Sequence, residues 1–206
     1  MSLIAMLTIL SVAPAILMMT TCFPFMVTVL AIVRQAIGLQ QSPPNMLMIG
    51  LALFLTWFVM EPVFMASWQG GLEPYTQEKI EFGTAIERTT APFYTFMLAR
   101  VDPHVLATIH ESVATAPPEP LDLEAPKLSH LTASFLISEL TRAFKIGFLI
   151  FLPFLIIDMV VSAVLMSMGM MMVPPAMVAL PFKLGFFALA DGWTMIALGL
   201  TQGYAT

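Results

Sequence analysis

The residues of this chain that could do chemistry are charged side chains placed inside long apolar stretches. Asp158 and Asp191 lie in two such stretches. Two carboxylates that share a proton can act as acid and base in a dry site, as in an aspartyl protease. However, the Gly-x-Gly-Asp context of intramembrane aspartyl proteases is absent, and Asp191 opens an Asp-Gly-Trp sequence. We therefore expect no catalytic residue, and the chain is predicted not to be an enzyme.

The same charges have a structural interpretation. A central Lys or Asp costs about 2.5–3.5 kcal/mol in a membrane-inserted helix, so Lys183 and Asp191 should face protein or water and be paired. Because they are eight residues apart, they are predicted to share a helix face at about 12 Å along the axis, too far to pair directly. Asp158 is a candidate partner for Lys183. We expect assembly salt bridges that involve Glu139, Asp158, Lys183 and Asp191.

Histidine and cysteine indicate no site of their own. His104, His110 and His130 do not follow HExxH or another metal-ligand spacing, so no metal is expected and no cofactor is predicted. Cys22 is the only cysteine, which excludes an intramolecular disulfide.

Composition sets the class of protein. Of the 206 residues, 59% are hydrophobic and 10% charged, whereas soluble domains carry about 25% charged residues. This indicates an integral membrane protein. The net charge of −5 lies within residues 67–134, which hold nine acidic and four basic residues. No basic patch is present, so no nucleic-acid partner is expected.

Four apolar stretches organise the chain. The first is too long for one spanning helix of about 20 residues and is expected to be kinked, with interruptions at Pro14 and Pro24. Proline-containing turns join the first two stretches and the last two, so two hairpins are predicted. The stretches are 3–33, 46–59 with a possible extension to 65, 135–168 and 176–200.

The predicted fold is an all-α membrane protein with two long helical hairpins and a helical hydrophilic insert between them. Residues 1–66 form the first hairpin, 67–134 the acidic insert and 135–206 the second hairpin. Within the insert, Thr76, Pro92 and the Asp102-Pro103 pair are each predicted to begin a helix, and residues 114–126 are predicted to form a loop.

Methionine is concentrated in one turn. Residues 162–175 contain five methionines, including Met170, Met171 and Met172, between flexible Gly169 and the Pro174-Pro175 pair. Methionine is unbranched and adaptable, so these three side chains could form a soft channel seal that yields to a passing substrate. The alternative is that they simply pack against other helices.

Several motifs together resemble the FliP family of type III secretion export-gate proteins, over nearly the whole chain. The motifs are RQAIG (34–38) with SPPN (42–45), GLALFLT (50–56), SEL (138–140), IGFLIFLPFLIID (146–158), MGMMMVPP (168–175), LPFKL (180–184) and DGW (191–193).

The resemblance implies a core subunit of the bacterial flagellar export gate, through which unfolded flagellar proteins pass. Such a subunit assembles into a ring with further copies of itself and with FliQ and FliR homologues, in the cell inner membrane and the flagellar basal body. FlhA and FlhB homologues and the exported unfolded flagellar proteins are further expected partners. The insert would belong to the periplasmic side, and methionines of the second hairpin would gather as a gasket.

Two other interpretations remain open. The injectisome counterparts of the family, the SctR group, share many of these motifs, and a small-solute secondary transporter could also be built from paired hairpins. The chain departs from the family pattern at residues 21–25 (TCFPF), where a Ser and a nearby basic residue are usual. Residues 1–3 carry no Lys or Arg, so no signal peptide is predicted at the start.

Overall fold

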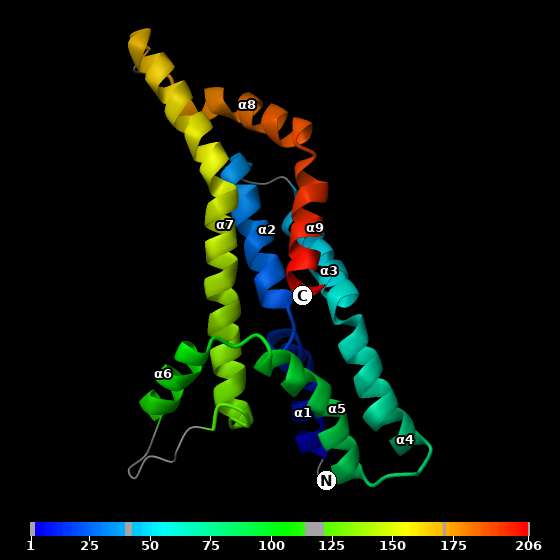
Figure 1. Cartoon of the computed structure of the whole chain (residues 1–206). Coiled ribbons are helices and arrows are strands. Elements are labelled where there is room, and N and C mark those ends of the chain that lie inside the picture. Colours follow the sequence, from blue (N-terminus) through cyan, green and yellow to red (C-terminus); the bar gives the residue numbers. More distant parts are fainter. Residues whose placement is uncertain (1–2, 40–42, 114–121, 171, 206) are drawn as a thin grey trace. The chain divides into compact units, whose positions relative to one another are not determined.

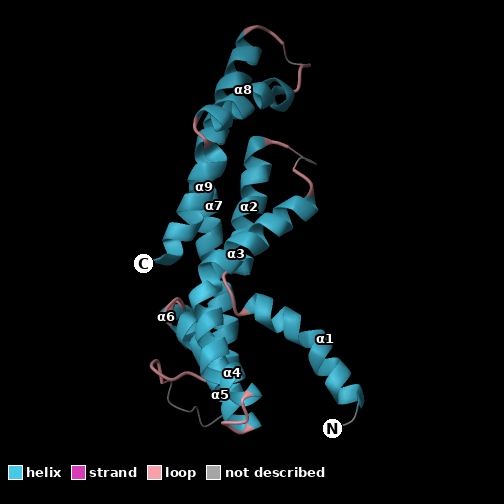
Figure 2. Ribbon diagram, turned by 90° about the vertical axis from the view of Figure 1, so that its right-hand side faces the viewer, coloured by secondary structure: helices cyan, strands magenta, loops and turns pink. Residues whose placement is uncertain are grey.

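The chain is built from helices. We describe a computed structural model, which covers residues 3–39, 43–113, 122–170 and 172–205. Within these ranges every regular element is a helix, and no strand occurs (Figure 2). The predicted all-α class is thereby confirmed.

The first apolar stretch is divided into α1 (Leu3–Met19) and α2 (Phe23–Ile37). At the break, the Thr21 hydroxyl donates to the carbonyl of Met18 at 3.0 Å and accepts the N–H of Phe23 at 3.3 Å. Pro24 follows in the first turn of α2, where a missing N–H is tolerated. The interruption predicted at Pro24 is found just before that residue, whereas the one predicted at Pro14 is wrong, because Pro14 lies inside α1.

In the described parts of the chain, two helical segments are long and apolar enough to span a membrane. Helix α3 (Asn45–Ser67) accommodates Pro62 and continues through a π-helical turn, η1 (Trp68–Leu72), into α4 (Glu73–Thr76). Helix α7 (Leu128–Ser167) has 40 residues, which is about 60 Å or twice the bilayer core. Only 28% and 11% of their apolar windows are buried, so most of this surface needs lipid or protein to cover it.

The last apolar stretch is bent. Helices α8 (Pro175–Leu189) and α9 (Gly192–Ala205) meet at 61° and could form one broken span (Figure 1). Asp191 lies at the bend with φ +49°, a left-handed conformation that interrupts a right-handed helix. The prediction that Lys183 and Asp191 share one helix face is therefore wrong, because α8 ends between them.

Close contacts divide the chain into two compact units. Unit 1 contains Met1–Pro24 and Thr56–Thr141, and unit 2 contains Phe25–Leu55 and Arg142–Thr206. Helices α3 and α7 each run through both units. The division into residues 1–66, 67–134 and 135–206 was made from hydropathy, whereas the two units are defined by contacts. The three-part division therefore stays a prediction.

Unit 1 contains the acidic insert, which is helical. Helix α5 (Phe82–Leu98) and helix α6 (Pro103–Val113) follow α4. Met97 packs with Leu131 and Phe135 of α7 in a buried cluster. The N–H of Asp102 donates to the hydroxyl of Ser138 on α7 at 3.0 Å, so the turn between α5 and α6 is fastened to the long helix.

The three helix starts predicted in the insert have different outcomes. The carboxylate of Asp102 accepts the N–H of His104 at 2.9 Å and caps α6, as predicted. Thr76 instead ends α4, and its hydroxyl donates back to the carbonyl of Glu73. Pro92 lies inside α5. Of the predicted loop, residues 122–126 are non-helical, and 114–121 lie outside the described residues.

In unit 2, α2 is the most buried helix. One face of it is completely covered, including Met26, Val29 and Val33. Gly147 lets α7 approach α2 closely, since a Cβ there would lie 2.4 Å from Cδ1 of Ile32. The absence of a side chain at Gly147 therefore permits the close spacing of these two helices.

Candidate functional site

Lys183 joins three helices of unit 2. It lies on α8 and is only 6% exposed. Its ammonium nitrogen is 2.6 Å from Oδ2 of Asp158 on α7 and donates to the carbonyl of Ala36 on α2 at 3.1 Å. The last carbonyls of a helix have no partner within that helix and carry partial negative charge. Lys183 thus neutralises a carboxylate and caps the end of α2 at once.

A second polar joint closes the turn between α2 and α3. Arg34 donates to the carbonyl of Pro43 at 3.4 Å and to the side-chain oxygen of Asn45. Gly38 ends α2 with φ +89°, a conformation that suits glycine. Residues 34–38 and 43–45, which belong to two of the sequence motifs, are therefore linked by these contacts.

The remaining charged positions predicted as salt-bridge residues lie elsewhere. Glu139 is buried on α7 but belongs to unit 1. Asp191 is exposed at the α8–α9 bend, where its carboxylate accepts the hydroxyl of Thr194 at 3.0 Å. Asp191 directly precedes α9, and its backbone carbonyl accepts the N–H of Met195 at 3.1 Å. Asp158 and Asp191, considered above as a carboxylate dyad, bind different partners.

Arg142 fastens the end of α9. Its guanidinium donates to the carbonyl of Gly203 at 3.0 Å. It also lies over the rings of Phe25 and Tyr204, at 5.9 and 5.5 Å from their centres. The helix end and both aromatic faces favour a cation at this point. The partners of Arg142 cannot be read from the sequence, because they come from helices distant in the sequence.

The methionine-rich turn has a defined start. The N–H of Met170 donates to the carbonyl of Leu165 at 3.0 Å, and that of Gly169 to Met166 at 3.1 Å. With Gly169 at φ +73°, this is the Schellman ending of α7. Met170 is 46% exposed and Met172 is 99% exposed. Met171 lies outside the described residues.

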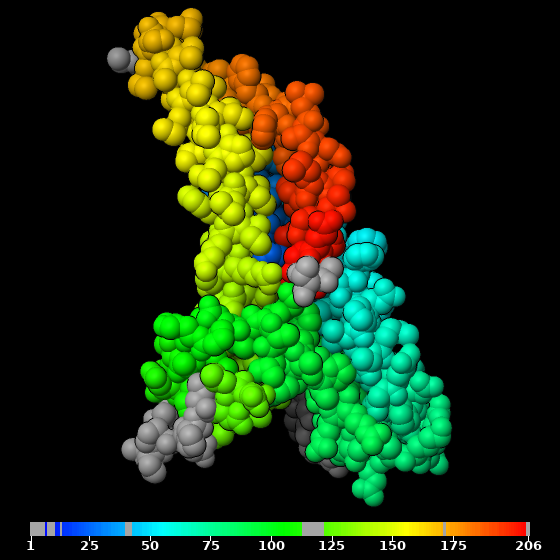
Figure 3. All heavy atoms as spheres, viewed as in Figure 1, coloured from blue at the N-terminus to red at the C-terminus, as the bar shows by residue number. Residues whose placement is uncertain are grey.

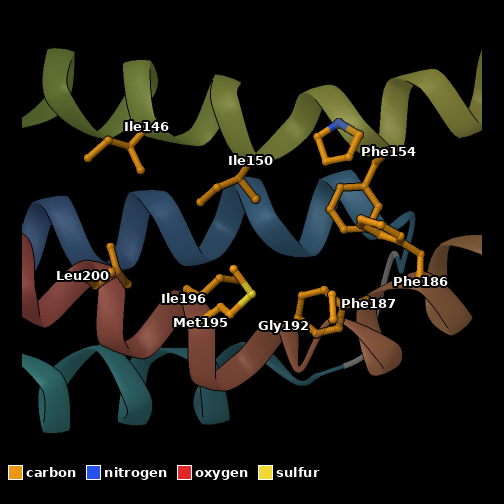
Figure 4. A pocket seen from close by; sticks show the side chains of 12 residues that line it. Ile146, Ile150, Phe154, Phe186, Phe187, Gly192, Met195, Ile196 and Leu200 are labelled. Carbon is orange, nitrogen blue, oxygen red and sulfur yellow. The ribbon is translucent and has the colours of Figure 1, made fainter.

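Two apolar hollows flank the bent pair of helices. One, of about 570 Å³, lies between α7 and α8, and Met168 and Met170 line it. The other, of about 380 Å³, lies between α7 and the α8–α9 bend. Figure 4 shows Phe154, Phe186 and Phe187 gathered at one end of it and Leu200 at the other.

The part of α7 in unit 2 carries many exposed apolar side chains, and Figure 3 draws its surface in yellow. Among them are Phe144, Phe148, Leu149, Ile156, Met159 and Val160. Such a face is suited to lipid or to another apolar helix.

Comparison with known proteins assigns the chain to a family. The model of the FliP family matches residues 6–200. The chain belongs to the FliP family. It is 48% identical, over 98% of its length, to the flagellar biosynthetic protein FliP of Caulobacter vibrioides, of which it covers 75%. It is 46% identical over 98% of its length to the FliP of Bacillus subtilis, covering 90% of that protein. With the FliP of Rhizobium meliloti it shares 42% over 97%, covering 81%.

In this FliP-family chain, the motifs that carry the resemblance lie at joints between helices. Arg34 and Asn45 close the α2–α3 turn, Gly147 sets the α2–α7 spacing, and Gly169 ends α7. Lys183 joins α2, α7 and α8. These residues of the FliP motifs therefore have structural roles within unit 2.

Proposed function

We propose that this chain is a core subunit of the flagellar type III protein export gate. The observation that carries the proposal is the match to the FliP family over residues 6–200, with relatives named flagellar biosynthetic protein FliP. In this proposal the subunit lies in the bacterial inner membrane, at the flagellar basal body, and its cargo is unfolded flagellar proteins. The two helical segments that are long and apolar enough to span a membrane support the membrane location.

In the proposed assembly, several copies form a ring with FliQ and FliR homologues, next to FlhA and FlhB homologues. The α2–α3 and α7–α8 pairs form the two hairpins, and the acidic insert lies on the periplasmic side. The exposed apolar faces of α3 and α7 support this proposal, because a single chain leaves them uncovered. Neighbouring subunits would bury them.

The channel seal is proposed at Met170, Met171 and Met172. The exposure of Met170 and Met172 beyond the end of α7 supports it, since a ring would bring such side chains to one axis. Thioethers pack against varied partners, and a hydrophobic constriction can exclude ions by dewetting.

The buried charges are proposed to be assembly residues without a catalytic role. Lys183 with Asp158 would hold the second hairpin in the shape that the ring requires, as the contact with Ala36 suggests. Glu139 and Asp191 would contribute at other positions, within or between subunits.

The test is complementation. A flagellated bacterium that lacks its own FliP is given this chain together with its cognate FliQ and FliR homologues. We expect hook or filament protein in the medium and a large complex with several copies of the chain on a blue-native gel. A complex that forms but exports only injectisome-type substrates would assign the chain to the SctR group. A monomer or dimer without export would contradict the proposal.

A further inference from the structure

Two histidines of unit 1 converge where α6 packs against the start of α7. Nδ1 of His110 lies 3.3 Å from Nδ1 of His130. The two ring centres are 5.3 Å apart and the rings are inclined by 71°. His110 lies in the last turn of α6 and His130 in the first turn of α7. Only the packing of the two helices brings them together.

We propose that His110 and His130 form a two-ligand site for a divalent transition metal of the zinc type. A tetrahedral zinc binds imidazole nitrogens at about 2.0–2.1 Å, which places two such nitrogens about 3.3–3.4 Å apart. The corresponding ring centres are then about 5.2 Å apart. Both distances agree with those of this pair.

A direct hydrogen bond between the rings fits the geometry less well. Nitrogen donors and their acceptors usually lie about 2.7–3.2 Å apart, so the 3.3 Å between the two Nδ1 atoms is at the weak, long end of hydrogen bonds in this structure. An end-on bond at this separation would also set the ring centres at about 5.6 Å. The observed 5.3 Å is shorter than this end-on value and close to the value for two nitrogens bound to one metal ion.

The surroundings admit a cation. Both histidines are half-buried, so the site is reachable from solvent. The stretch 67–134 around them carries a net charge of −5, which raises the local concentration of cations. No third ligand is assembled there among the described residues. Water would complete the coordination, and the metal would clamp α6 to α7.

The test uses the full chain without a histidine tag, purified in detergent. Zinc binding is measured by competition with a chromophoric chelator, and thermal unfolding is followed by circular dichroism with and without Zn²⁺. We expect one zinc per chain and a higher melting temperature with the metal. His110→Gln or His130→Gln should weaken binding about 10-fold or more and remove the thermal response. His104 lies at an exposed position on α6, the helix that carries His110, so His104→Ala should behave like the wild type.

Glutamine keeps a hydrogen-bonding partner but is a poor zinc ligand, so these variants separate a metal site from a simple contact between rings. If they unfold, His110→Cys and His130→Cys decide the matter, because thiolate also binds zinc and should restore binding. Three outcomes would overturn the proposal: no zinc binding by the wild type at submillimolar concentrations, unchanged affinity in the glutamine variants, or equal loss in His104→Ala.

Discussion

At the scale of single residues, Lys183 shows how an apolar chain tolerates a charge. A buried ammonium is costly unless it is paired and hydrogen-bonded. Asp158 and the carbonyl of Ala36 supply both partners. A buried pair of this kind adds little net stability, but losing one partner leaves the other uncompensated. Its contribution is therefore to specify how α2, α7 and α8 meet.

Lys183→Met should destabilise unit 2 and weaken ring assembly. Asp158 is 33% exposed, so the expected cost is about 1–3 kcal/mol, below that of a fully buried orphaned charge. The measurement is the yield of the multimer on a blue-native gel, with export as the second readout.

The double variant Lys183→Met with Asp158→Leu serves as the control. Because it removes both charges, it should assemble better than Lys183→Met alone. Normal assembly and export by Lys183→Met alone would show that the pair has no role in assembly.

At the scale of elements, glycines set how closely helices pack. Gly71 lies in η1 against α5, and a Cβ there would be 2.1 Å from Oγ1 of Thr89 and 2.8 Å from the carbonyl oxygen of Ala85. The hydroxyl of Ser67 donates to the carbonyl of Thr89 at 2.8 Å across the same contact. Since backbone atoms cannot rotate away as a side chain does, this contact admits only glycine.

Gly71→Ala should separate η1 from α5 and lower the free energy of unfolding by about 1–3 kcal/mol. Gly70→Ala is the matched control, because its nearest neighbour would lie at an ordinary 3.7 Å. Thermal unfolding followed by circular dichroism would check this. Equal melting temperatures for the two variants would refute the steric argument.

The insert has buried aromatic contacts and an exposed apolar surface. Substitutions at these two kinds of position should have different effects on stability and on assembly. Phe96 contacts Phe135 at a ring-centre distance of 5.9 Å, so Phe96→Ala should lower stability by about 1–3 kcal/mol. Ile86 is 48% exposed, so Ile86→Glu should leave stability within about 0.5 kcal/mol but reduce the yield of the multimer. Melting temperature and native-gel yield, measured on both variants, test the distinction. A normal multimer from Ile86→Glu would remove Ile86 from the proposed interface.

At the scale of the whole molecule, much of the apolar surface is uncovered in a single chain. The proposed ring provides neighbours for the spanning helices and a common axis for the methionine turns. Gly169 ends α7 abruptly, and Pro174 and Pro175 begin α8, so the exposed Met170 and Met172 lie between two fixed helix ends.

Replacing Met170, Met171 and Met172 together by alanine should widen the proposed constriction. We expect small solutes or ions to leak through the assembled complex while export continues, because shorter side chains leave the axis open. The measurement is membrane permeability to a small solute in cells that express the variant with its partner subunits. Wild-type permeability in the presence of assembled complex would mean that these methionines only pack.

Much of the architecture could be predicted from the sequence, because hydropathy and helix-breaking residues act locally. The apolar stretches, the break near Pro24, the helical insert and the Asp102 cap all follow from residue type and spacing. The family motifs were also readable, because they are contiguous. Asp158 was a candidate partner for Lys183 because an apolar helix cannot leave such a charge alone.

Tertiary structure decided which helix faces meet. Asp191 adopts a left-handed conformation at a bend, so counting eight residues along one helix placed it wrongly relative to Lys183. Pro92 is accommodated inside α5, whereas local preference alone predicts a helix start there. Arg142 with Gly203, and His110 with His130, are brought together by packing. Contacts between residues far apart in the sequence depend on the angle and spacing of helices, and local spacing carries no information about them.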